Sequence, residues 1–416
     1  MKSPAIWILH AALWFVVSAP GFSAERDEVA AVAAIKRLGG SVEYDKNKAL
    51  VAIGFPSDKE LTDANLKHLK GLTNLRRLYL GKINLTEAGL MHLKGLPNLR
   101  TLHLTGTKVS NNTLEHLKEL RNLEGLSLAY TNVTDAGLEH LKGMTKLQDL
   151  SLDHTRITHV GVGHLKRLTK LNYLGLSETY INDAGMKHLK GLKSLVFLNL
   201  NKTYISDAGL VELKGLNDLR WLMLWDTNIG DAGLEHLKEL HNLQWLYLEK
   251  THVTDAGLKH LKGLTKIDDL NLRETRVTDA GLKHLKGLTK LQALDLSYTK
   301  VTDAGLERLK GLKNLQTLHL TGTKVTDAGL QHLKGLKNLQ SLDLTRTKVS
   351  DAGLEHVKGL TNLRSLHLSF TNVSDAGLEH LKGLKKLEYL SFLDTKVTVS
   401  GVKKLKQELP KLDISD

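Results

Sequence analysis

The sequence predicts an α/β solenoid in which a parallel β-sheet lines one face and short helices cover the other. Three observations support this fold class. A 24-residue repeat runs over residues 61–396 in fourteen copies without an insertion. Each copy contains an L-x-x-L-x-L segment or a close variant, and its period of two is that of a strand. Most copies also begin with a segment such as V-T-D-A-G-L, which is typical of a helix start.

Residues 1–24 have the features of a secretory signal peptide. Lys2 precedes an apolar run over residues 5–17, and small residues follow it up to Ala24. Cleavage fits best after Ala24; a cut after Ser23, or retention as an uncleaved anchor, stays open. The run is shorter than the ~20 residues that a stable membrane span needs. We therefore expect an exported protein that is periplasmic, attached to the cell surface or secreted.

The two ends of the array differ from the repeats and are expected to cap its apolar core. Residues 25–60 form the N-terminal cap, with a helix over residues 25–38 and a hairpin of strands over residues 42–44 and 50–55. Residues 397–416 form the C-terminal cap. The chain has no cysteine, which excludes disulfides and zinc–thiolate sites.

Each repeat can be interpreted position by position, counted from its first Val, Ile or Leu. The leucines at positions 18 and 20 of the strand point inward, so positions 17 and 19 point to the concave face. Position 2 is suited to a helix N-cap, and Asp at position 3 lies in the positive first turn of the helix. Position 23 is Thr from Thr107 to Thr395, with Ile83 as the exception. We expect these threonines to form a buried ladder that satisfies backbone groups in the turns.

The pattern L-x-x-L-x-L-x-x-T-x-V-T-D-A-G-L resembles that of leucine-rich repeats. The V-T-D-A-G-L segment is similar to that of the cysteine-containing subclass in F-box proteins, and the 24-residue threonine version resembles exported repeat proteins of planctomycete-type bacteria. Nothing before Leu61 resembles an F-box, so ubiquitin-ligase function is not implied. The resemblance implies a horseshoe whose fourteen strands span an inner arc of roughly 60–70 Å, and a scaffold that binds proteins.

The net charge of +13 is compatible with an anionic partner such as nucleic acid, lipid or acidic polysaccharide. The repeat offers a structural explanation instead. Position 10 is Lys in all fourteen copies and at the equivalent place in the C-terminal cap, from Lys70 to Lys406, and a cation in the last helical turn is stabilised by about 0.3–1 kcal/mol. We favour the structural explanation. Aspartates at the opposite helix ends then give one acidic and one basic rim.

Neither a metal site nor a cofactor is predicted. Twelve of the twenty histidines fall at position 8, from His68 to His380, on helices expected ~10 Å apart, too far for shared ligands of one metal. Position 19 places Asp295, His319, Asp343 and His367 on four adjacent strands, where neighbours could hydrogen-bond or chelate. We favour a surface ladder without a ligand.

The sequence does not predict an enzyme. It contains no Gly-rich phosphate loop after a strand, no H-E-x-x-H and no G-x-S-x-G. One strand and its exit hold Asp149, Ser151, Asp153 and His154, which are the residue types of a hydrolase. Alternation along the strand should point these side chains in different directions.

The candidate binding site is a set of aromatic residues on the concave face. Position 17 holds Tyr173, Phe197, Trp221 and Trp245 on consecutive strands; Met223 and Tyr247 hold position 19, and Trp225 holds position 21. Other copies carry Thr101, Gly125 or Ser341 at position 17, so the fold does not require a bulky side chain at that position. We expect an exposed, contiguous patch that binds a ligand together with Asp226, Glu249 and Asp269. The alternative is that cross-strand stacking only stiffens the array.

Charged residues near this patch narrow the choice of partner. Five carboxylates (Glu178, Asp226, Glu249, Asp269, Glu274) accompany three bases (Lys202, Lys250, Arg273), which argues against nucleic acid. Two hypotheses remain: a protein-binding scaffold, and a polysaccharide-binding groove in which Trp and Tyr stack on sugar rings. We favour the first by analogy with repeat arrays of this class.

Overall fold

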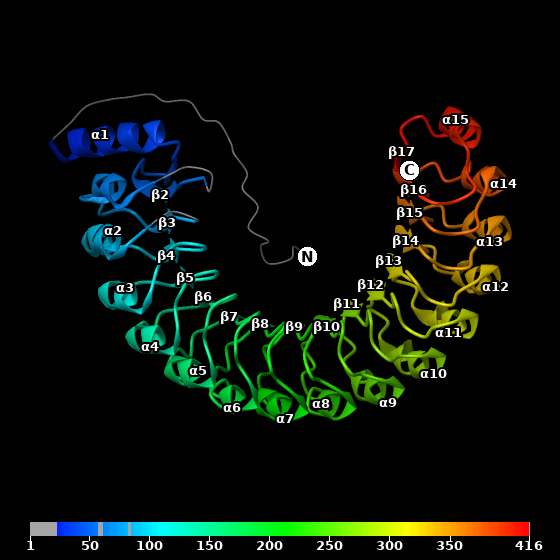
Figure 1. The fold of residues 1–416 in the computed structure, drawn as a ribbon, viewed down its shortest axis with the longest axis horizontal. Coiled ribbons are helices and arrows are strands. Elements are labelled where there is room, and N and C mark those ends of the chain that lie inside the picture. Colours follow the sequence, from blue (N-terminus) through cyan, green and yellow to red (C-terminus); the bar gives the residue numbers. More distant parts are fainter. Residues whose placement is uncertain (1–22, 57–60, 82–84, 416) are drawn as a thin grey trace.

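The computed structural model describes residues 23–56, 61–81 and 85–415, which form an open arc with the strands on the inside and the helices on the outside (Figure 1). The predicted fold class is therefore confirmed. Residues 1–22, which make up nearly all of the predicted signal peptide, and Ile83 lie outside the described residues. Helix α1 (Ser23–Arg37) packs at one end of the arc and α15 (Val399–Glu408) at the other.

Within the described residues, the sheet contains seventeen strands in chain order. β1 (Ser41–Tyr44) and β2 (Leu50–Gly54) form an antiparallel hairpin, and every later strand pairs in parallel with the one before it. The fourteen strands of the repeats occupy positions 17–19: β3 (Arg77–Tyr79), β4 (Thr101–His103), β5 (Gly125–Ser127), β6 (Asp149–Ser151), β7 (Tyr173–Gly175), β8 (Phe197–Asn199), β9 (Trp221–Met223), β10 (Trp245–Tyr247), β11 (Asp269–Asn271), β12 (Ala293–Asp295), β13 (Thr317–His319), β14 (Ser341–Asp343), β15 (Ser365–His367) and β16 (Tyr389–Ser391). A further strand, β17 (Asp413–Ser415), pairs with β16 beyond the last repeat.

The convex side is built from short helices that start at position 3. The α-helices are α2 (Glu87–Met91), α3 (Asn111–Glu115), α4 (Asp135–Leu138), α5 (His159–Leu165), α6 (Asp183–Met186), α7 (Asp207–Leu210), α8 (Asp231–Glu235), α9 (Asp255–Leu258), α10 (Asp279–Leu282), α11 (Asp303–Arg308), α12 (Asp327–Leu330), α13 (Asp351–Val357) and α14 (Asp375–Leu378). Many continue as a 3₁₀ turn, and the 3₁₀ segments are η1 (Asp63–Leu69), η2 (His92–Gly95), η3 (His116–Glu119), η4 (Glu139–Leu141), η5 (Val211–Leu213), η6 (Lys259–Leu261), η7 (Lys283–Gly287), η8 (Leu309–Gly311), η9 (Gln331–Leu333) and η10 (Glu379–Leu381). The predicted single helix of each copy is therefore often divided in two.

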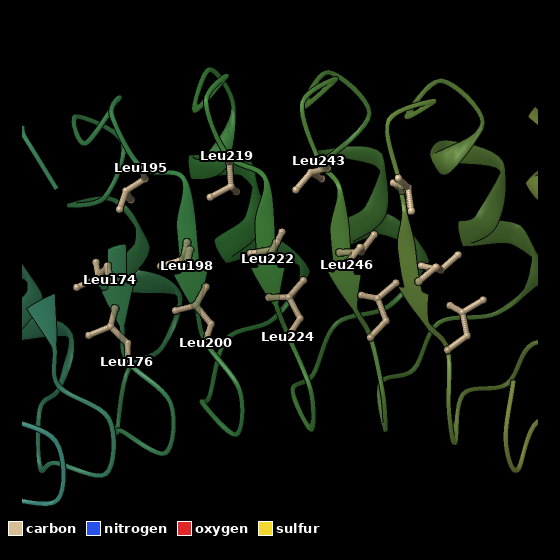
Figure 2. Close-up of a cluster of buried hydrophobic side chains, with 14 of the residues drawn as sticks. Leu174, Leu176, Leu195, Leu198, Leu200, Leu219, Leu222, Leu224, Leu243 and Leu246 are labelled. Carbon is tan, nitrogen blue, oxygen red and sulfur yellow. The ribbon is translucent and has the colours of Figure 1, made fainter. Parts of the chain in front are cut away.

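The core is a stack of leucines, because equivalent positions of neighbouring repeats lie against each other. In the middle of the arc, Leu222 and Leu224 of one repeat pack beside Leu198, Leu200 and Leu246 of its neighbours (Figure 2). All five side chains are fully buried. Burial of each leucine contributes about 1.5–3 kcal/mol, and each depends on the neighbouring repeat for its cover.

The threonine ladder is confirmed. Thr251 is buried, and its hydroxyl donates to the carbonyl oxygen of Leu248 at 2.6 Å. The same bond, from position 23 to the carbonyl three residues earlier, recurs in all thirteen copies from Thr107 to Thr395. It satisfies a carbonyl in the turn that follows each strand.

The aspartate at position 3 has a role that the sequence analysis did not predict. Oδ1 of Asp135 accepts the backbone N–H of Thr158, the N-cap of the next repeat, at 2.7 Å, and Oδ2 accepts the Thr158 hydroxyl at 2.6 Å. Gly161 makes room for this contact, since a Cβ there would lie 2.3 Å from Oδ1. Most junctions have the same carboxylate bond to the following N-cap. The aspartates thus latch neighbouring repeats together. Most carboxylates of the predicted acidic rim are therefore hydrogen-bonded to the next repeat.

Candidate functional site

Four aromatic side chains form a row across the middle of the concave face, where β7–β10 lie (Figure 1). The strand registers align Tyr173 with Phe197, Phe197 with Trp221, and Trp221 with Trp245. The Tyr173 and Phe197 rings stack with centroids 4.4 Å apart and planes 9° apart. Trp221 and Trp245 stack at 4.4 Å and 11°. We call these four residues the aromatic row.

The expected exposure of the patch was wrong. Every member of the aromatic row is half-buried, as are Met223, Trp225 and Tyr247. The reason is the stacking itself, because rings on strands about 4.8 Å apart cover each other's faces and leave their edges toward the concavity. The area offered to a ligand is therefore smaller than the sequence analysis assumed.

Tyr247 connects the aromatic row to a carboxylate. Its hydroxyl donates to Oδ2 of Asp269 at 3.0 Å, and Asp269 lies directly beside Trp245 in the strand register. Burial raises the pKa of the Asp269 carboxyl to about 6, although the hydrogen bond from Tyr247 acts in the opposite direction. Burial also raises the pKa of the Tyr247 hydroxyl, and the neighbouring Asp269 adds to that shift.

A second carboxylate lies at the other end of the aromatic row. Asp149 pairs in register with Tyr173, so position 17 reads Asp, Tyr, Phe, Trp, Trp, Asp from β6 to β11. Asp149 is exposed, and its carboxylate has no hydrogen bond or ion pair with the residues that the structure describes. The aromatic row is thus bracketed by two carboxylates.

Trp225 and Asp226 lie at the exit of β9 and not on the floor of the concave face. Lys202 Nζ sits 4.7 Å above the Trp225 ring centroid, and Lys250 Nζ lies 5.7 Å from it. The Trp225 Nε1 is buried and has no hydrogen-bond acceptor among the described residues. Asp226 is exposed in a left-handed conformation with φ of 55°. The structure therefore places these two predicted site residues at the edge of the arc where the strands end, which we call the rim.

The remaining predicted site residue, Glu249, is half-buried at the exit of β10. Its Oε1 lies 3.2 Å from Arg273 Nε, and its Oε2 is within 3.4 Å of Asn271 Nδ2. Burial raises the pKa of the Glu249 carboxyl, which Arg273 partly offsets.

The sequence analysis missed a chain of contacts along this rim. Position 22 adopts positive φ in nearly every repeat, so its side chains project side by side. The Tyr130 hydroxyl lies 2.7 Å from His154 Nε2, His154 Nδ1 lies 3.1 Å from Glu178, and Glu178 pairs with Lys202 at 2.8 Å. Four exposed tyrosines, Tyr130, Tyr180, Tyr204 and Tyr298, hold position 22 or 24 along the same rim. The glycines at position 22, Gly106 and Gly322, were the available signal for this conformation.

The predicted Asp–His ladder forms only in part. His319 Nδ1 lies 3.6 Å from Asp295 Oδ2. Asp343, in contrast, accepts the backbone N–H of Thr345, and no histidine of the described residues donates a hydrogen bond to it. His367 Nδ1 and Nε2 hydrogen-bond the Ser391 and Ser365 hydroxyls. Among the described residues, no group of three or more metal-ligating side chains could hold an ion.

The hydrolase-type residues are not arranged for catalysis. Ser151 donates to Asp153 at 2.7 Å, while the His154 ring stacks on Tyr130 with centroids 3.9 Å apart. His154 therefore extends along the rim, away from the serine that a catalytic base would have to reach.

The helix lysines agree with the structural explanation of the charge. Six position-10 lysines pair with a glutamate three residues earlier, for example Lys142 with Glu139 at 2.9 Å and Lys358 with Glu355 at 3.2 Å. The concave face and the strand exits have the opposite character. Positions 17 and 19 on the strands, together with position 21 at their exits, carry six carboxylates against two arginines and no lysine: Asp149, Asp153, Glu249, Asp269, Asp295 and Asp343 against Arg77 and Arg273.

Comparisons with known proteins agree with this architecture. Residues 145–205, 265–325 and 313–373 match the leucine rich repeat family model. An internalin from Listeria monocytogenes is 24% identical, covers 80% of this chain and 88% of its own, and superposes with a TM-score of 0.62. An LRR protein of Leptospira interrogans is 22% identical over 86% of this chain and 95% of its own, with a TM-score of 0.61. A search of curated proteins finds no match.

The chain is thus a leucine-rich repeat solenoid. Proteins with such repeats generally act as protein-binding scaffolds and are typically not enzymes. The likeness to the F-box subclass and to planctomycete-type repeats stays a prediction. Within the described ranges, no helix combines the length and apolar character that crossing a membrane requires.

Proposed function

We propose that this chain is a non-enzymatic scaffold that binds a protein partner on its concave face, centred on the aromatic row, Met223 and Tyr247. The observation that carries the proposal is the placement of bulky rings at position 17 of four consecutive strands. The same position holds Thr101, Gly125 and Ala293 elsewhere in the sheet, so the repeat does not need aromatic side chains there. Aromatic residues are also those most enriched at the energetic centres of interfaces.

The surroundings of the aromatic row favour a polypeptide with apolar and cationic side chains. Ring edges and the Met223 side chain offer apolar contact, while Asp149, Asp269 and Glu249 offer carboxylates around it. An excess of carboxylates over arginines disfavours nucleic acid, whose backbone requires cations. Asp226 and Trp225 would contact only a partner that also covers the rim. We further propose that the protein acts outside the cytoplasm, on the strength of the signal-peptide pattern in residues 1–24.

The test is a pull-down from the source organism with the mature chain, followed by affinity measurement with the captured protein. Changing Trp221 and Trp245 to Ser should weaken binding more than tenfold, because hot-spot aromatics contribute about 2 kcal/mol or more. Tyr389→Ser is the matched control, since Tyr389 holds position 17 at the far end of the array.

Two outcomes would refute the proposal. Loss of thermal stability by many degrees with unchanged affinity would make the stacked rings a structural brace. Binding of a purified glycan through Trp221 and Trp245, without any protein partner, would favour the polysaccharide alternative instead.

A further inference from the structure

Two tyrosines on the rim have exposed rings that the fold does not explain. Tyr180 and Tyr204 hold position 24 of consecutive repeats, and no other copy has a tyrosine at that position. Tyr180 is 53% and Tyr204 60% exposed, and neither hydroxyl forms a hydrogen bond with the residues that the structure describes. Their ring centroids lie 6.3 Å apart, compared with 4.4 Å for the stacked pairs of the aromatic row, so much of each ring stays accessible.

Two aromatic residues at position 22 of the same rim are covered by a cation of the same chain. The guanidinium carbon of Arg273 lies 4.6 Å from the ring centroid of Tyr298, and that of Arg346 lies 4.7 Å from the ring centroid of Phe370. These rings therefore have a partner within the chain. No such contact accounts for the two tyrosines at position 24.

The position-22 side chains beside the two tyrosines alternate in charge. Along five repeats they are Glu178, Lys202, Asp226, Lys250 and Glu274. A line of alternating charges is complementary to its own reverse, and so is a pair of identical rings. Both properties are those of a surface that can form a two-fold symmetric contact with another copy of itself.

We propose that the rim around Tyr180 and Tyr204 binds a second copy of this chain in a symmetric dimer. The two-fold axis crosses the rim between these two tyrosines, so Tyr180 of each copy lies against Tyr204 of the other. Because the strands run across the plane of the arc, their ends lie on one side of it, and a second arc can cover that side (Figure 1).

The same axis brings unlike charges together at position 22. Glu178 of each copy faces Lys202 of the other, and Asp226 faces His154. Within one chain, Glu178 already pairs with Lys202 at 2.8 Å and lies 3.1 Å from His154. The dimer extends these pairs into a network of alternating charges across the axis.

Position 24 favours this axis over its neighbour. Arg156 faces the uncharged Asn228 of the second copy, and two cations, Arg276 and Lys108, face each other only at the margin of the contact. Moving the axis by one repeat, to lie between Tyr204 and Asn228, keeps the alternation at position 22 but brings Arg156 against Arg276. The tyrosine pair and the cations thus select the same register.

The position-3 aspartates oppose the dimer near the axis, since Asp183 faces Asp207 of the second copy. Both carboxylates already accept the backbone N–H of the next N-cap, from Ser206 at 2.7 Å and from Gly230 at 2.6 Å, and both lie at helix N-termini. The helix dipole and these bonds weaken their repulsion. The four tyrosine rings of two copies offer roughly 400 Å² of exposed surface, about a quarter of a standard interface, and can form its core.

This inference does not depend on the proposed concave-face function, because the rim and the aromatic row share no side chain. The first experiment is sedimentation equilibrium of the mature chain over a range of concentrations. The test variant is Y180S/Y204S. The matched control is Y298S/F370S, which removes two rim aromatics far from the axis. Circular dichroism first shows that each variant folds.

The second experiment tests the register through its charges. E178K and K202E each place like charges against each other across the axis, so each variant alone should be mainly monomeric. In an equal mixture, one chain supplies two lysines and the other two glutamates, and a dimer with one chain of each kind should form. Contacts within a single chain cannot produce this recovery.

We expect the unchanged chain and the control to dimerise, and the dissociation constant of Y180S/Y204S to be more than tenfold larger. A chain that stays monomeric at every concentration would overturn the inference. Equal weakening of the dimer by Y298S/F370S would do the same, and so would a mixture of E178K and K202E that dimerises no better than either variant alone.

Discussion

Replacing Asp255 by alanine should weaken one junction between repeats by about 2–5 kcal/mol. Asp255 Oδ1 accepts the Thr278 N–H at 2.7 Å, and Oδ2 accepts the Thr278 hydroxyl at 2.6 Å. Alanine leaves that partly buried N–H without an acceptor, at a cost of about 1–3 kcal/mol, and also loses the hydroxyl bond, worth about 0.5–1.5 kcal/mol. A carboxylate in the first helical turn contributes a further ~0.3–1 kcal/mol.

The chain itself supplies the control for this prediction. Asn111 takes the place of the aspartate at one junction, where its amide accepts the Thr134 N–H and donates to the Thr134 hydroxyl, both at 2.8 Å. Asp255→Asn should therefore keep both bonds and lose only the charge, about 0.3–1 kcal/mol.

Repeat arrays can unfold in parts, so the denaturant midpoint should be combined with hydrogen exchange of the Thr278 amide. Faster exchange in the alanine variant than in the asparagine variant is expected. Equal exchange rates and midpoints in the two variants would refute the latch.

Three further predictions concern separate parts of the molecule. Thr251→Val keeps the side-chain shape but removes the bond to Leu248, so it should cost about 1–3 kcal/mol; an unchanged denaturant midpoint would show that the hydroxyl contributes nothing. The folded pKa of Asp269, about 6, lies above the unfolded value of about 3.9, so its charge destabilises the fold above pH 6 and this cost disappears as the pH falls toward 4. Asp269→Asn should then gain stability relative to the unchanged chain at pH 7.5 but not at pH 4, and a constant difference between thermal midpoints at both pH values would contradict this. The mature protein should begin near Glu25, and mass spectrometry that finds intact Met1 to Ala24 on cytoplasmic protein would disprove export.

The fold was predictable because the sequence has two periods with a direct structural meaning. The period of two matches the alternation of side chains along a strand, and the period of 24 matches the step from one repeat to the next. A period of two places Leu222 and Leu224 on the same side of one strand, and the 24-residue period places Leu246 beside Leu222 in the next. The threonine ladder followed from the same reasoning, since a hydroxyl repeated after each strand must find a backbone partner when it is buried.

The candidate site was predictable in position but not in conformation. Alternation correctly placed Trp221 and Trp245 toward the concave face, yet it could not show that their rings stack and become half-buried. The Asp135–Thr158 latch escaped prediction for a different reason. The latch joins two residues that are 23 positions apart in the sequence. The presence of Asp135 at this position was already explained locally, because a negative charge is favourable at the start of a helix.

The surface of this array is organised in columns of residues that hold the same position in successive repeats. The position within the repeat determines the face on which a residue lies. The repeat determines where along the arc it lies. A substitution at position 17 changes contacts with positions 17 and 19 of the adjoining strands, as in the stacking of Trp221 on Trp245 and the hydrogen bond from Tyr247 to Asp269. It leaves the leucines at positions 18 and 20, and hence the strand register, unchanged. Single substitutions can therefore add or remove a ring or a cation in one column without disturbing the core. This independence explains how an acidic, aromatic concave face and a basic rim can exist in a chain whose repeats are otherwise nearly uniform.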